Sequence, residues 1–261
     1  MTRTPPPLRA LETWLMAFRH AWRGAAIASV LNPTLFLAAM GVGLGRVVDE
    51  SATATETLGG VEYLAFLAPG LLAAAAVQAA AGEATYPVMA GIKWTRTYHA
   101  MIATPLRVVD VLAGHLSWIA LRVFVGSAVF LVVMALFGAV TSWMAVLAVP
   151  AATLAGLSMA APIAAYSATL DGDAPFAALL RFVVTPMFLF SGTFFPVSEL
   201  PAWLRPVAWL TPLWHGVSLC RDLALARADL LPSLGHAAYL GALVALGVRW
   251  GTRTFSRRLT S

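Results

Sequence analysis

Apolar residues run through the chain in long stretches that are separated by short polar segments. A helix rises about 1.5 Å per residue, so about 20 consecutive apolar residues cross the roughly 30 Å hydrocarbon core of a bilayer. The pattern therefore predicts an all-α membrane protein whose six transmembrane helices form one domain over residues 1–261. We expect the spans at residues 25–45, 63–81, 111–137, 143–170, 176–190 and 234–248.

A short segment with helical spacing of its apolar residues precedes the first span. Within residues 8–23 the apolar positions share one helical face and the charged positions fall largely elsewhere, with Leu8, Leu11, Leu15 and Phe18 set against Arg9, Glu12 and Arg19. This pattern is typical of an amphipathic helix that lies at the membrane interface. The alternative is a charged anchor that only orients the first span.

Basic residues are divided unequally between the two sides of such a bundle. If both termini are cytoplasmic, the inner segments hold Arg3, Arg9, Arg19, Arg23, Lys93, Arg96, Arg107, Arg181, Arg249, Arg253, Arg257 and Arg258. The outer segments then hold only Arg46, Arg205, Arg221 and Arg227, and Arg122 falls within the third span. Cytoplasmic loops carry an excess of Lys and Arg, so the pattern predicts a multi-pass protein with both ends inside.

Helix breakers and tryptophans are concentrated after the fifth span. Ser191-Gly192 ends the apolar run, and the polar and aromatic stretch that follows contains Pro196, Pro201, Pro206 and Pro212 together with Trp203, Trp209 and Trp214. Trp prefers the interface between hydrocarbon and headgroups. We expect residues 191–233 to form a re-entrant helical hairpin on the extracytoplasmic side, or else an interfacial aromatic belt.

Composition agrees with a membrane protein and limits what else the chain can be. The 261 residues are 60% hydrophobic and 11% charged, and the mean hydropathy is +0.80, whereas soluble domains are roughly 25% charged. Six spans leave no room for a separate soluble catalytic domain. The net charge of +5 comes from residues scattered at span ends, which argues against a nucleic-acid partner. Cys220 is the only cysteine, so an intrachain disulfide is excluded.

The sequence offers no complete catalytic, cofactor-binding or metal-binding motif. Lys93, the only lysine, is followed by Trp94 and lacks the spacing of the phosphate-binding loop GxxxxGK[ST]. The five histidines show no HExxH spacing, and Ser191 lacks the GxSxG context of a nucleophile elbow. Asp171 and Asp173 fit a solvated inner turn better than a metal site. We therefore expect no catalytic residue and no cofactor in this chain.

Ionisable residues inside the spans are scarce, which argues against an ion-coupled carrier. The central parts of the six predicted spans contain no Asp or Glu. His115 and Arg122 are seven residues apart on the third span and share a helical face. These two side chains either face a translocation path or are satisfied by polar groups within the bundle.

Two segments resemble the permease subunits of the ABC transporter type-2 family, particularly its nodulation-factor and daunorubicin-type exporter branch. Residues 82–116 contain a basic, aromatic turn followed by the Thr-Pro-Leu-Arg element at 104–107. Residues 189–223 contain the Ser-Gly break, Phe-Pro, Leu-Pro-x-Trp-Leu and Pro-Leu-x-His-Gly in that order. The resemblance covers nearly the whole chain and includes the six-span plan.

The resemblance implies a bacterial inner-membrane exporter of an amphiphile such as a drug, lipid, glycolipid or polysaccharide-like molecule. ATP and Mg would be used by a cytoplasmic ATP-binding cassette ATPase, present in two copies. A second permease copy, forming a homodimer, or a paralogue would complete the membrane part. A stand-alone secondary carrier or lipid scramblase is the alternative function. A membrane-embedded enzyme is a third class, but no convergent set of catalytic groups supports it.

The resemblance also implies candidate site residues. The inner loop 83–110 would couple to the ATPase through Glu83, Lys93, Trp94, Arg96 and Tyr98, unless it is only a solvated basic loop. The outer segment would gate the exit through Ser191, Gly192, Phe194, Phe195 and Pro196. A lipid-like substrate would pass along Phe36, Phe66, Gln78, Arg122 and Phe188, although core packing is the commoner fate of such residues.

Overall fold

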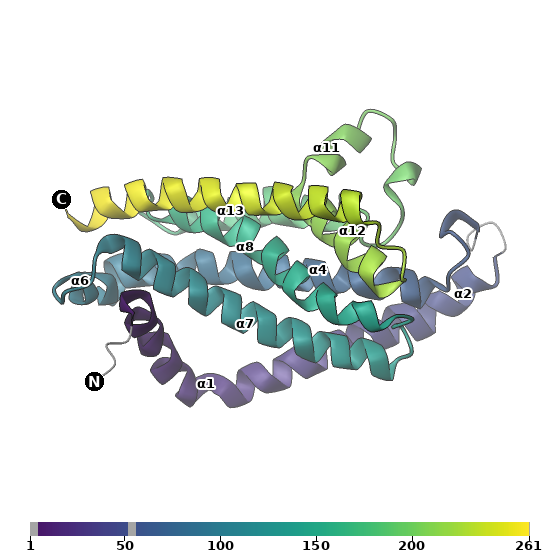
Figure 1. Cartoon of the computed structure of the whole chain (residues 1–261), viewed down its shortest axis with the longest axis horizontal. Helices are drawn as coiled ribbons and strands as arrows, with labels where there is room; N and C mark the ends of the chain where they lie inside the picture. The colour runs from purple at the N-terminus through teal and green to yellow at the C-terminus, as the bar shows by residue number, and fades with distance from the viewer. Residues whose placement is uncertain (1–4, 52–55, 261) are drawn as a thin grey trace.

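The computed structural model describes residues 5–51 and 56–260, and within these ranges the secondary structure consists of helices and turns. The helices form an elongated bundle, and the beginning of α1 lies at the same end as the end of α13 (Figure 1). In chain order the elements are α1 Pro6–Leu37, η1 Ala38–Leu44, α2 Gly45–Asp49, α4 Tyr63–Ala84, α5 Tyr86–Met89, η2 Ala90–Trp94, α6 Thr97–Ile102, α7 Val108–Leu136, η3 Trp143–Leu147, α8 Ala148–Ser167, α9 Ala174–Leu179, η4 Leu180–Val184, α10 Thr185–Phe190, η5 Val197–Glu199, α11 Arg205–Trp209, α12 Pro212–Ala224 and α13 Leu230–Leu259.

Five helical stretches in the described ranges are long and apolar enough to cross a membrane. They are Ser29–Asp49, Tyr63–Trp94, Val108–Leu136, Trp143–Ser167 and Leu230–Leu259. The predicted span 176–190 falls in the shorter apolar stretch Ala174–Phe190. At about 1.5 Å per residue its length is roughly 25 Å, less than a roughly 30 Å hydrocarbon core. The all-helical membrane fold is confirmed, and the sixth span stays a prediction.

Helical structure continues into two segments that were predicted to lie outside the spans. The last helix continues beyond residue 248 to Leu259, because the arginines after 248 are good helix formers and no proline interrupts them. The inner loop 83–110 is largely helical, since α5, η2 and α6 follow one another between Tyr86 and Ile102. A break at Thr85, with φ −97° and ψ −98°, separates α4 from these short helices.

The predicted interface helix is the first part of one continuous helix. In Figure 1 the first turns of α1 lie at a steep angle to the rest of that helix. Ala10 is fully buried and packs on α7, where a Cβ added at Gly114 would lie 2.5 Å from the Cβ of Ala10. Leu8 and Leu15, which were placed on the apolar face, are 46% and 38% exposed. Side chains 17–23 lie outside the described part of the structure.

Helices α4 and α8 form the centre of the bundle, with α13, α7 and α12 packed around them. Small residues permit the close approach, as is usual between membrane helices. A Cβ added at Gly247 of α13 would lie 2.6 Å from the backbone nitrogen of Pro162 in α8. A Cβ added at Gly216 of α12 would lie 2.6 Å from the Cβ of Ala155. Larger side chains at these glycines would therefore separate the helices.

The predicted hairpin region consists of two different parts. Residues 192–210, which we call the cap, protrude from the bundle around α11, whereas α12 returns into it (Figure 1). The cap has a small core of its own formed by Val197, Leu200 and Ala208, with Phe195 packed against them. Helix α12 instead contributes to the main core and contacts α4, α8 and α13.

Candidate transport site

A lateral groove opens between α1, α4, α7 and α10. Its cavity volume is about 780 Å³, and a neighbouring cavity of about 270 Å³ shares Asn32, Pro33, Ala75, Ala79 and Phe130 with it. Helix α4 is buried from residue 65 to residue 81 except at Ala75, Gln78 and Ala79, which are exposed. These positions have the spacing of one helical face, so a single stripe of α4 forms the groove wall.

The structure brings together most of the residues that were predicted to form a pathway. Phe36, Gln78 and Phe188 line the larger cavity, and Arg122 lines the smaller one. Phe66 does not line either cavity. It is 5% exposed, and the guanidinium carbon of Arg221 lies 3.7 Å from the centre of its ring. Its ring packs against α12 instead, and its predicted place in the pathway stays a prediction.

Arg122 is ion-paired with Glu83 rather than unpaired in the bundle. Glu83 lies in the last turn of α4, and its other carboxylate oxygen accepts a hydrogen bond of 3.3 Å from Trp118 Nε1. The guanidinium is thus satisfied by a polar group of the bundle, which was one of the two interpretations. Because the Arg122 side chain is 42% exposed and lines the smaller cavity, the ion pair also forms part of the groove wall.

Tyr98 is the centre of a buried cluster at the end of the bundle that is predicted to face the cytoplasm. We call this cluster the inner hub and define it as Trp14, Glu83, Tyr98, His115 and Phe255. The Tyr98 hydroxyl lies 3.1 Å from His115 Nδ1, and His115 Nε2 lies 3.1 Å from the Glu83 carbonyl oxygen. A neutral imidazole that donates from Nε2 to this carbonyl leaves Nδ1 free to accept from the tyrosine.

Aromatic packing extends the inner hub to the first and last helices. Trp14 of α1 lies 5.1 Å from the His115 ring and 6.1 Å from the Tyr98 ring, measured between centroids. Phe255 of α13 lies 5.8 Å from the Tyr98 ring. Helices α1, α7 and α13 therefore contact Tyr98 of α6, and α4 joins the hub through the contact of Glu83 with His115. Burial of Tyr98 raises the pKa of its phenol well above the ordinary value of 10.

The predicted coupling residues separate into buried and exposed groups. Tyr98 is 1% exposed and Glu83 is directed at α7, so neither offers its side chain to a partner surface in this structure. Trp94 is 58% exposed, and Arg96 is exposed with a left-handed φ of 52°. Direct contact with a second protein is therefore a prediction for the exposed residues, while Tyr98 lies behind them.

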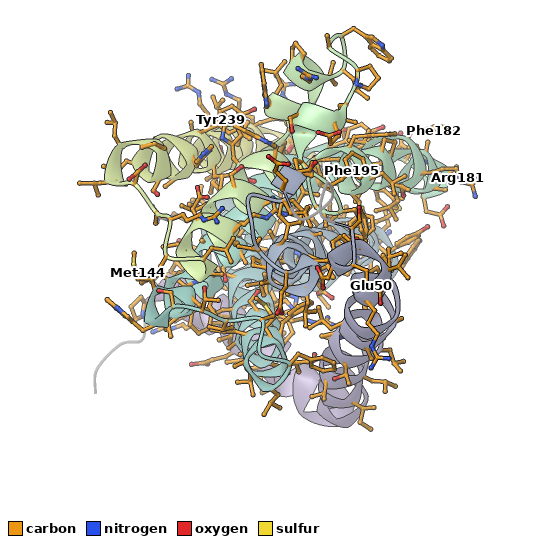
Figure 2. The ribbon with its side chains drawn as sticks, turned by 90° about the vertical axis from the view of Figure 1, so that its right-hand side faces the viewer. Glu50, Met144, Arg181, Phe182, Phe195 and Tyr239 are labelled. Carbon is orange, nitrogen blue, oxygen red and sulfur yellow. The ribbon has the colours of Figure 1, made fainter. Side chains whose placement is uncertain are left out.

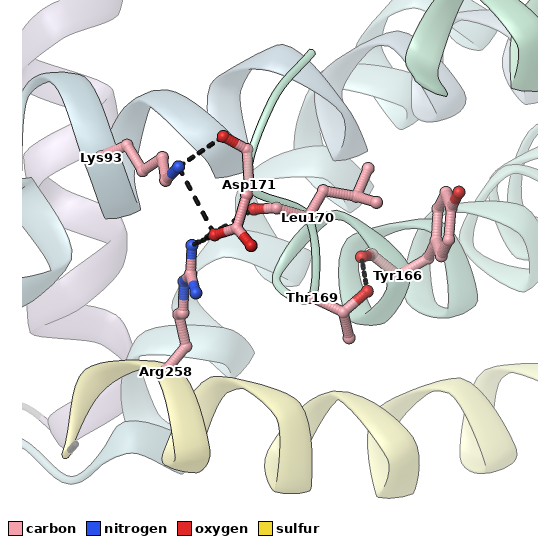
Figure 3. A network of polar contacts seen from close by, with 6 residues as sticks. All are labelled: Lys93, Tyr166, Thr169, Leu170, Asp171 and Arg258. Carbon is pink, nitrogen blue, oxygen red and sulfur yellow. Dashed lines mark hydrogen bonds and ion pairs between the residues drawn. The ribbon is translucent and has the colours of Figure 1, made fainter. Parts of the chain in front are cut away.

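Lys93 belongs to an ionic clasp formed by Lys93, Asp171 and Arg258 (Figure 3). The Lys93 ammonium donates a 2.5 Å hydrogen bond to the Asp171 carbonyl and lies 3.6 Å from its carboxylate. Arg258 Nη2 donates to Asp171 Oδ1 at 2.5 Å. Arg258 first and Lys93 second hold the pKa of Asp171 below its ordinary value of 3.8. The predicted solvated turn thus connects the inner loop to α13.

A basic hollow lies beside this clasp. Its volume is about 410 Å³, and Ile92, Lys93, Arg96, His99 and Arg258 line it. Lys93, Arg96 and Arg258 outnumber the single carboxylate of Asp171 that pairs with two of them, so the hollow presents a positive potential. The residues come from η2, α6 and the end of α13, segments that are far apart in the sequence.

The predicted gate residues lie where the cap joins the groove. Ser191 is fully buried, and its hydroxyl lies 2.8 Å from that of Thr211, which ties the two ends of the cap. Gly192 has φ 80°, the left-handed conformation that commonly ends a helix. Phe194 packs edge-on against the groove residue Phe188, with ring centroids 5.0 Å apart. Phe195 packs within the cap, beside Pro196 in sequence.

Sequence reasoning did not identify two further contacts of α12. Arg221 reaches backbone carbonyls of α4 and of the cap. His215 Nδ1 lies 2.7 Å from His236 Nδ1, and Tyr239 stacks on His215 at 3.9 Å between centroids. These partners lie on separate helices, and no spacing rule links them. Figure 2 shows Tyr239 on the opposite side of the bundle from Arg181 and Phe182, which point outward.

Within the described ranges, no group of three or more His, Cys, Asp or Glu side chains is arranged to hold a metal ion. The groove is lined mainly by apolar side chains, the centre of the inner hub is buried, and the ionic clasp lies beside the basic hollow.

The chain belongs to the ABC-2 type transporter family, whose profile matches residues 12–225. It is a membrane component of a transporter, and membership of this family implies an ATP-binding cassette ATPase as partner. The chain is 34% identical over 245 residues to nodulation protein J of Bradyrhizobium diazoefficiens, covering 90% of this chain and 88% of the relative. Nodulation protein J of Rhizobium leguminosarum bv. trifolii is 33% identical over 238 residues, or 88% and 86% of the two chains. That of Rhizobium meliloti is 30% identical over 243 residues, or 90% and 88%.

Proposed function

We propose that this chain is the permease subunit of an ATP-binding cassette exporter that moves an amphiphile out of the cytoplasm or the inner leaflet. Two copies of a separate ATPase bind ATP and Mg on the cytoplasmic side. A second copy of this chain, or a paralogue, completes the membrane part. The similarity to nodulation protein J over most of both chains supports an export role.

The observation that carries the proposal is that the same helices line the groove and meet at the inner hub. Helices α1, α4 and α7 supply groove residues, and they also supply Trp14, Glu83 and His115 to the hub. A displacement of α6 that moves Tyr98 would therefore shift the walls of the groove. Close packing makes such a transfer possible, because protein interiors transmit strain.

The groove suits a molecule with an apolar body and a polar group. Phe36, Phe130 and Phe188 supply aromatic surface, and the amide of Gln78 is a hydrogen-bonding group within it. The Arg122 ion pair supplies a polar region in the adjoining cavity. Few polar groups in a largely apolar pocket are typical of sites that orient an apolar ligand.

In this proposal the chain has six spans with both termini in the cytoplasm. The stretch Ala174–Phe190 is the fifth span, and a shorter span is accommodated by local thinning of the bilayer or by snorkelling of flanking residues. Arg181 lies within this stretch, and Figure 2 shows its side chain pointing outward, from where it can reach the headgroups. The cap and α12 form the re-entrant gate on the outer side.

The ATPase docks on the exposed part of the inner loop. Trp94 supplies apolar surface, and the basic hollow containing Arg96 accepts acidic side chains of the partner. The ionic clasp fixes Lys93 relative to α13, so a push on the loop moves several helices together. Docking and the copy number are tested together by co-purification and mass measurement of the complex.

The decisive experiment is copurification with the ATPase, followed by transport into inverted vesicles of a panel of fluorescent amphiphiles. We expect uptake that requires ATP and is inhibited by vanadate. Transport by the purified chain alone, without ATP, would instead establish a carrier or scramblase. A matched sample whose ATPase has lost its phosphate-binding lysine controls for passive leakage.

A further inference from the structure

Arg221 of α12 is satisfied by backbone carbonyls rather than by a carboxylate. Its Nε donates to the Phe66 carbonyl at 3.0 Å, and Nη2 donates to the carbonyls of Gly192 at 2.8 Å and Thr193 at 3.4 Å. Among the described residues no carboxylate oxygen lies within 4.0 Å of it. The guanidinium carbon also lies 3.7 Å from the Phe66 ring centre.

One side chain thus joins three segments of the outer end: α12, α4 and the first residues of the cap. Hydrogen bonds from a charged donor are stronger than neutral ones, and an aromatic face adds a further attraction. A guanidinium can hold several carbonyls at once because its donors have a fixed, planar arrangement. A lysine at this position would offer one point charge and could not hold the same set.

Gly70 of α4 lies directly against the contact between Arg221 and the Thr193 carbonyl. A Cβ added there would lie 2.9 Å from Arg221 Nη2, 3.0 Å from the Thr193 carbonyl oxygen and 3.2 Å from the Thr193 Cα. These distances are too short for any side chain without a shift. The Gly70→Ala substitution should therefore disturb the same contact from the α4 side without replacing Arg221 itself.

The two arms of the hairpin are held with different strength. Helix α12 is fixed in the main core, where Gly216 packs against Ala155 and Cys220 is fully buried. The polar contacts at the base of the cap include the Arg221 bonds and the hydroxyl contact between Ser191 and Thr211 at its beginning, and a 2.5 Å bond from the Tyr239 hydroxyl of α13 to the Leu210 carbonyl at its end. The cap has a small core that also contacts Trp214 of α12, so we expect the cap to move as a unit about this contact without unfolding.

We propose that Arg221 is a positioning residue that holds the cap closed over the outer end of the groove. The cap opens when the Gly192 and Thr193 carbonyls leave the guanidinium, while α12 stays in the bundle. Phe194 would then withdraw from Phe188 and uncover the groove. This inference rests on the proposed gating role of the cap.

Thr193 provides a reporter for this movement. It is fully buried, and its hydroxyl has no hydrogen-bond partner, so Thr193→Cys removes no bond. The reporter is introduced into a Cys220→Ala background, which leaves it as the only cysteine in the chain. A membrane-impermeant maleimide applied from the outside measures its exposure in the complete complex with the ATPase.

We expect slow labelling with Arg221 present and faster labelling in Arg221→Gln and in Gly70→Ala. The increase should be about tenfold or more, because loss of a hydrogen bond from a charged donor changes an opening equilibrium by at least that factor. Arg221→Lys should give an intermediate rate. The matched control is Arg227→Gln, since Arg227 donates a 2.9 Å bond to the Gly59 carbonyl in a neighbouring outer loop and does not touch the cap. This control should label at the slow rate.

Three outcomes are distinguishable. Faster labelling in Arg221→Gln and Gly70→Ala, at unchanged yield and thermal stability of the complex, supports the proposal. Unchanged labelling in both variants overturns it, and so does a loss of stability without faster labelling of the folded complex. If both variants label faster but labelling of the parent never responds to ATP and vanadate, Arg221 holds the cap and the proposed gating role fails.

Discussion

The carboxylate of Glu83 in α4 pairs with the guanidinium of Arg122 in α7, 39 residues further along the chain. Removing one partner leaves a partly buried charge without compensation. Because the Arg122 side chain is 42% exposed, we expect Glu83→Gln to lower stability by about 1–2 kcal/mol, between the values typical of surface and buried pairs. Thermal unfolding in detergent of both single variants and of Glu83→Gln/Arg122→Gln measures the coupling. If the two single effects are additive, the pair contributes nothing.

Tyr98 connects the inner hub through its hydroxyl. Tyr98→Phe removes the bond to His115 Nδ1 while the ring packing stays, so we expect a loss of about 1 kcal/mol. Tyr98→Ala should cost about 3–5 kcal/mol because it also leaves a cavity. Tyr86→Phe is the matched control, since Tyr86 is 41% exposed. Equal effects of Tyr98→Phe and Tyr86→Phe in a thermal unfolding assay would contradict the role of the hydroxyl.

Arg96 has an exposed side chain on a left-handed backbone, which allows charge and conformation to be tested separately. Arg96→Gly keeps the conformation and removes the charge, because glycine adopts a φ of 52° without strain. Arg96→Glu reverses the charge in the basic hollow. We expect Arg96→Glu to uncouple ATP hydrolysis from transport and Arg96→Gly to weaken the coupling less. Wild-type assembly, ATPase activity and export in Arg96→Glu would refute the coupling role of this residue.

The ionic clasp predicts a pH dependence of stability. The pKa of Asp171 is lowered by Arg258 and Lys93, so the contribution of its carboxylate is present above the ordinary pKa of 3.8. That contribution is lost as the pH falls through the lower pKa of the folded protein. As the pH falls from about 6 to about 3, the thermal unfolding temperature of the wild type should therefore decrease more than that of Asp171→Asn. Asp173→Asn, two residues away in the same turn, should behave like wild type.

The groove predicts that filling it blocks transport. Ala79 lines both cavities, so Ala79→Trp should reduce transport by about tenfold or more while complex assembly is retained. Val132→Trp is the control, because Val132 is 59% exposed on α7 and lines neither cavity. Equal transport by the two variants at equal amounts of complex would show that the substrate takes another route.

The apolar pattern predicted which segments are helical because hydrocarbon requires every backbone group to be bonded within its own helix. It placed the spans near α4, α7, α8 and α13, and the breakers at Ser191-Gly192 marked the end of α10. Pattern alone could not locate the end of α13, since basic residues at 249–258 remain helical outside an apolar run. It also could not separate the protruding cap from the buried α12, because both parts contain tryptophans and apolar residues.

Of the predicted pathway residues, Phe36, Gln78 and Phe188 line the groove, whereas Phe66 is buried against α12. The direction of a side chain on a membrane helix depends on its neighbours, and apolar residues face lipid, groove and core alike. For the same reason the sequence predicts Tyr98 as a contact residue, whereas its side chain is buried in this structure. A basic, aromatic turn indicates an inner loop, and burial decides which of its residues remain accessible.

Hydrophobic pattern and charge bias by themselves determined the helical membrane class, because both depend only on how each segment partitions between water and lipid. The motif in residues 189–223 indicated the resemblance to the ABC transporter type-2 family. The tertiary structure decided that Glu83 meets Arg122, that Asp171 meets Lys93 and Arg258, and that Arg221 meets the carbonyls of Gly192 and Thr193. Such pairs join helices that are distant in the sequence, and only the packing of the bundle brings them within hydrogen-bonding distance.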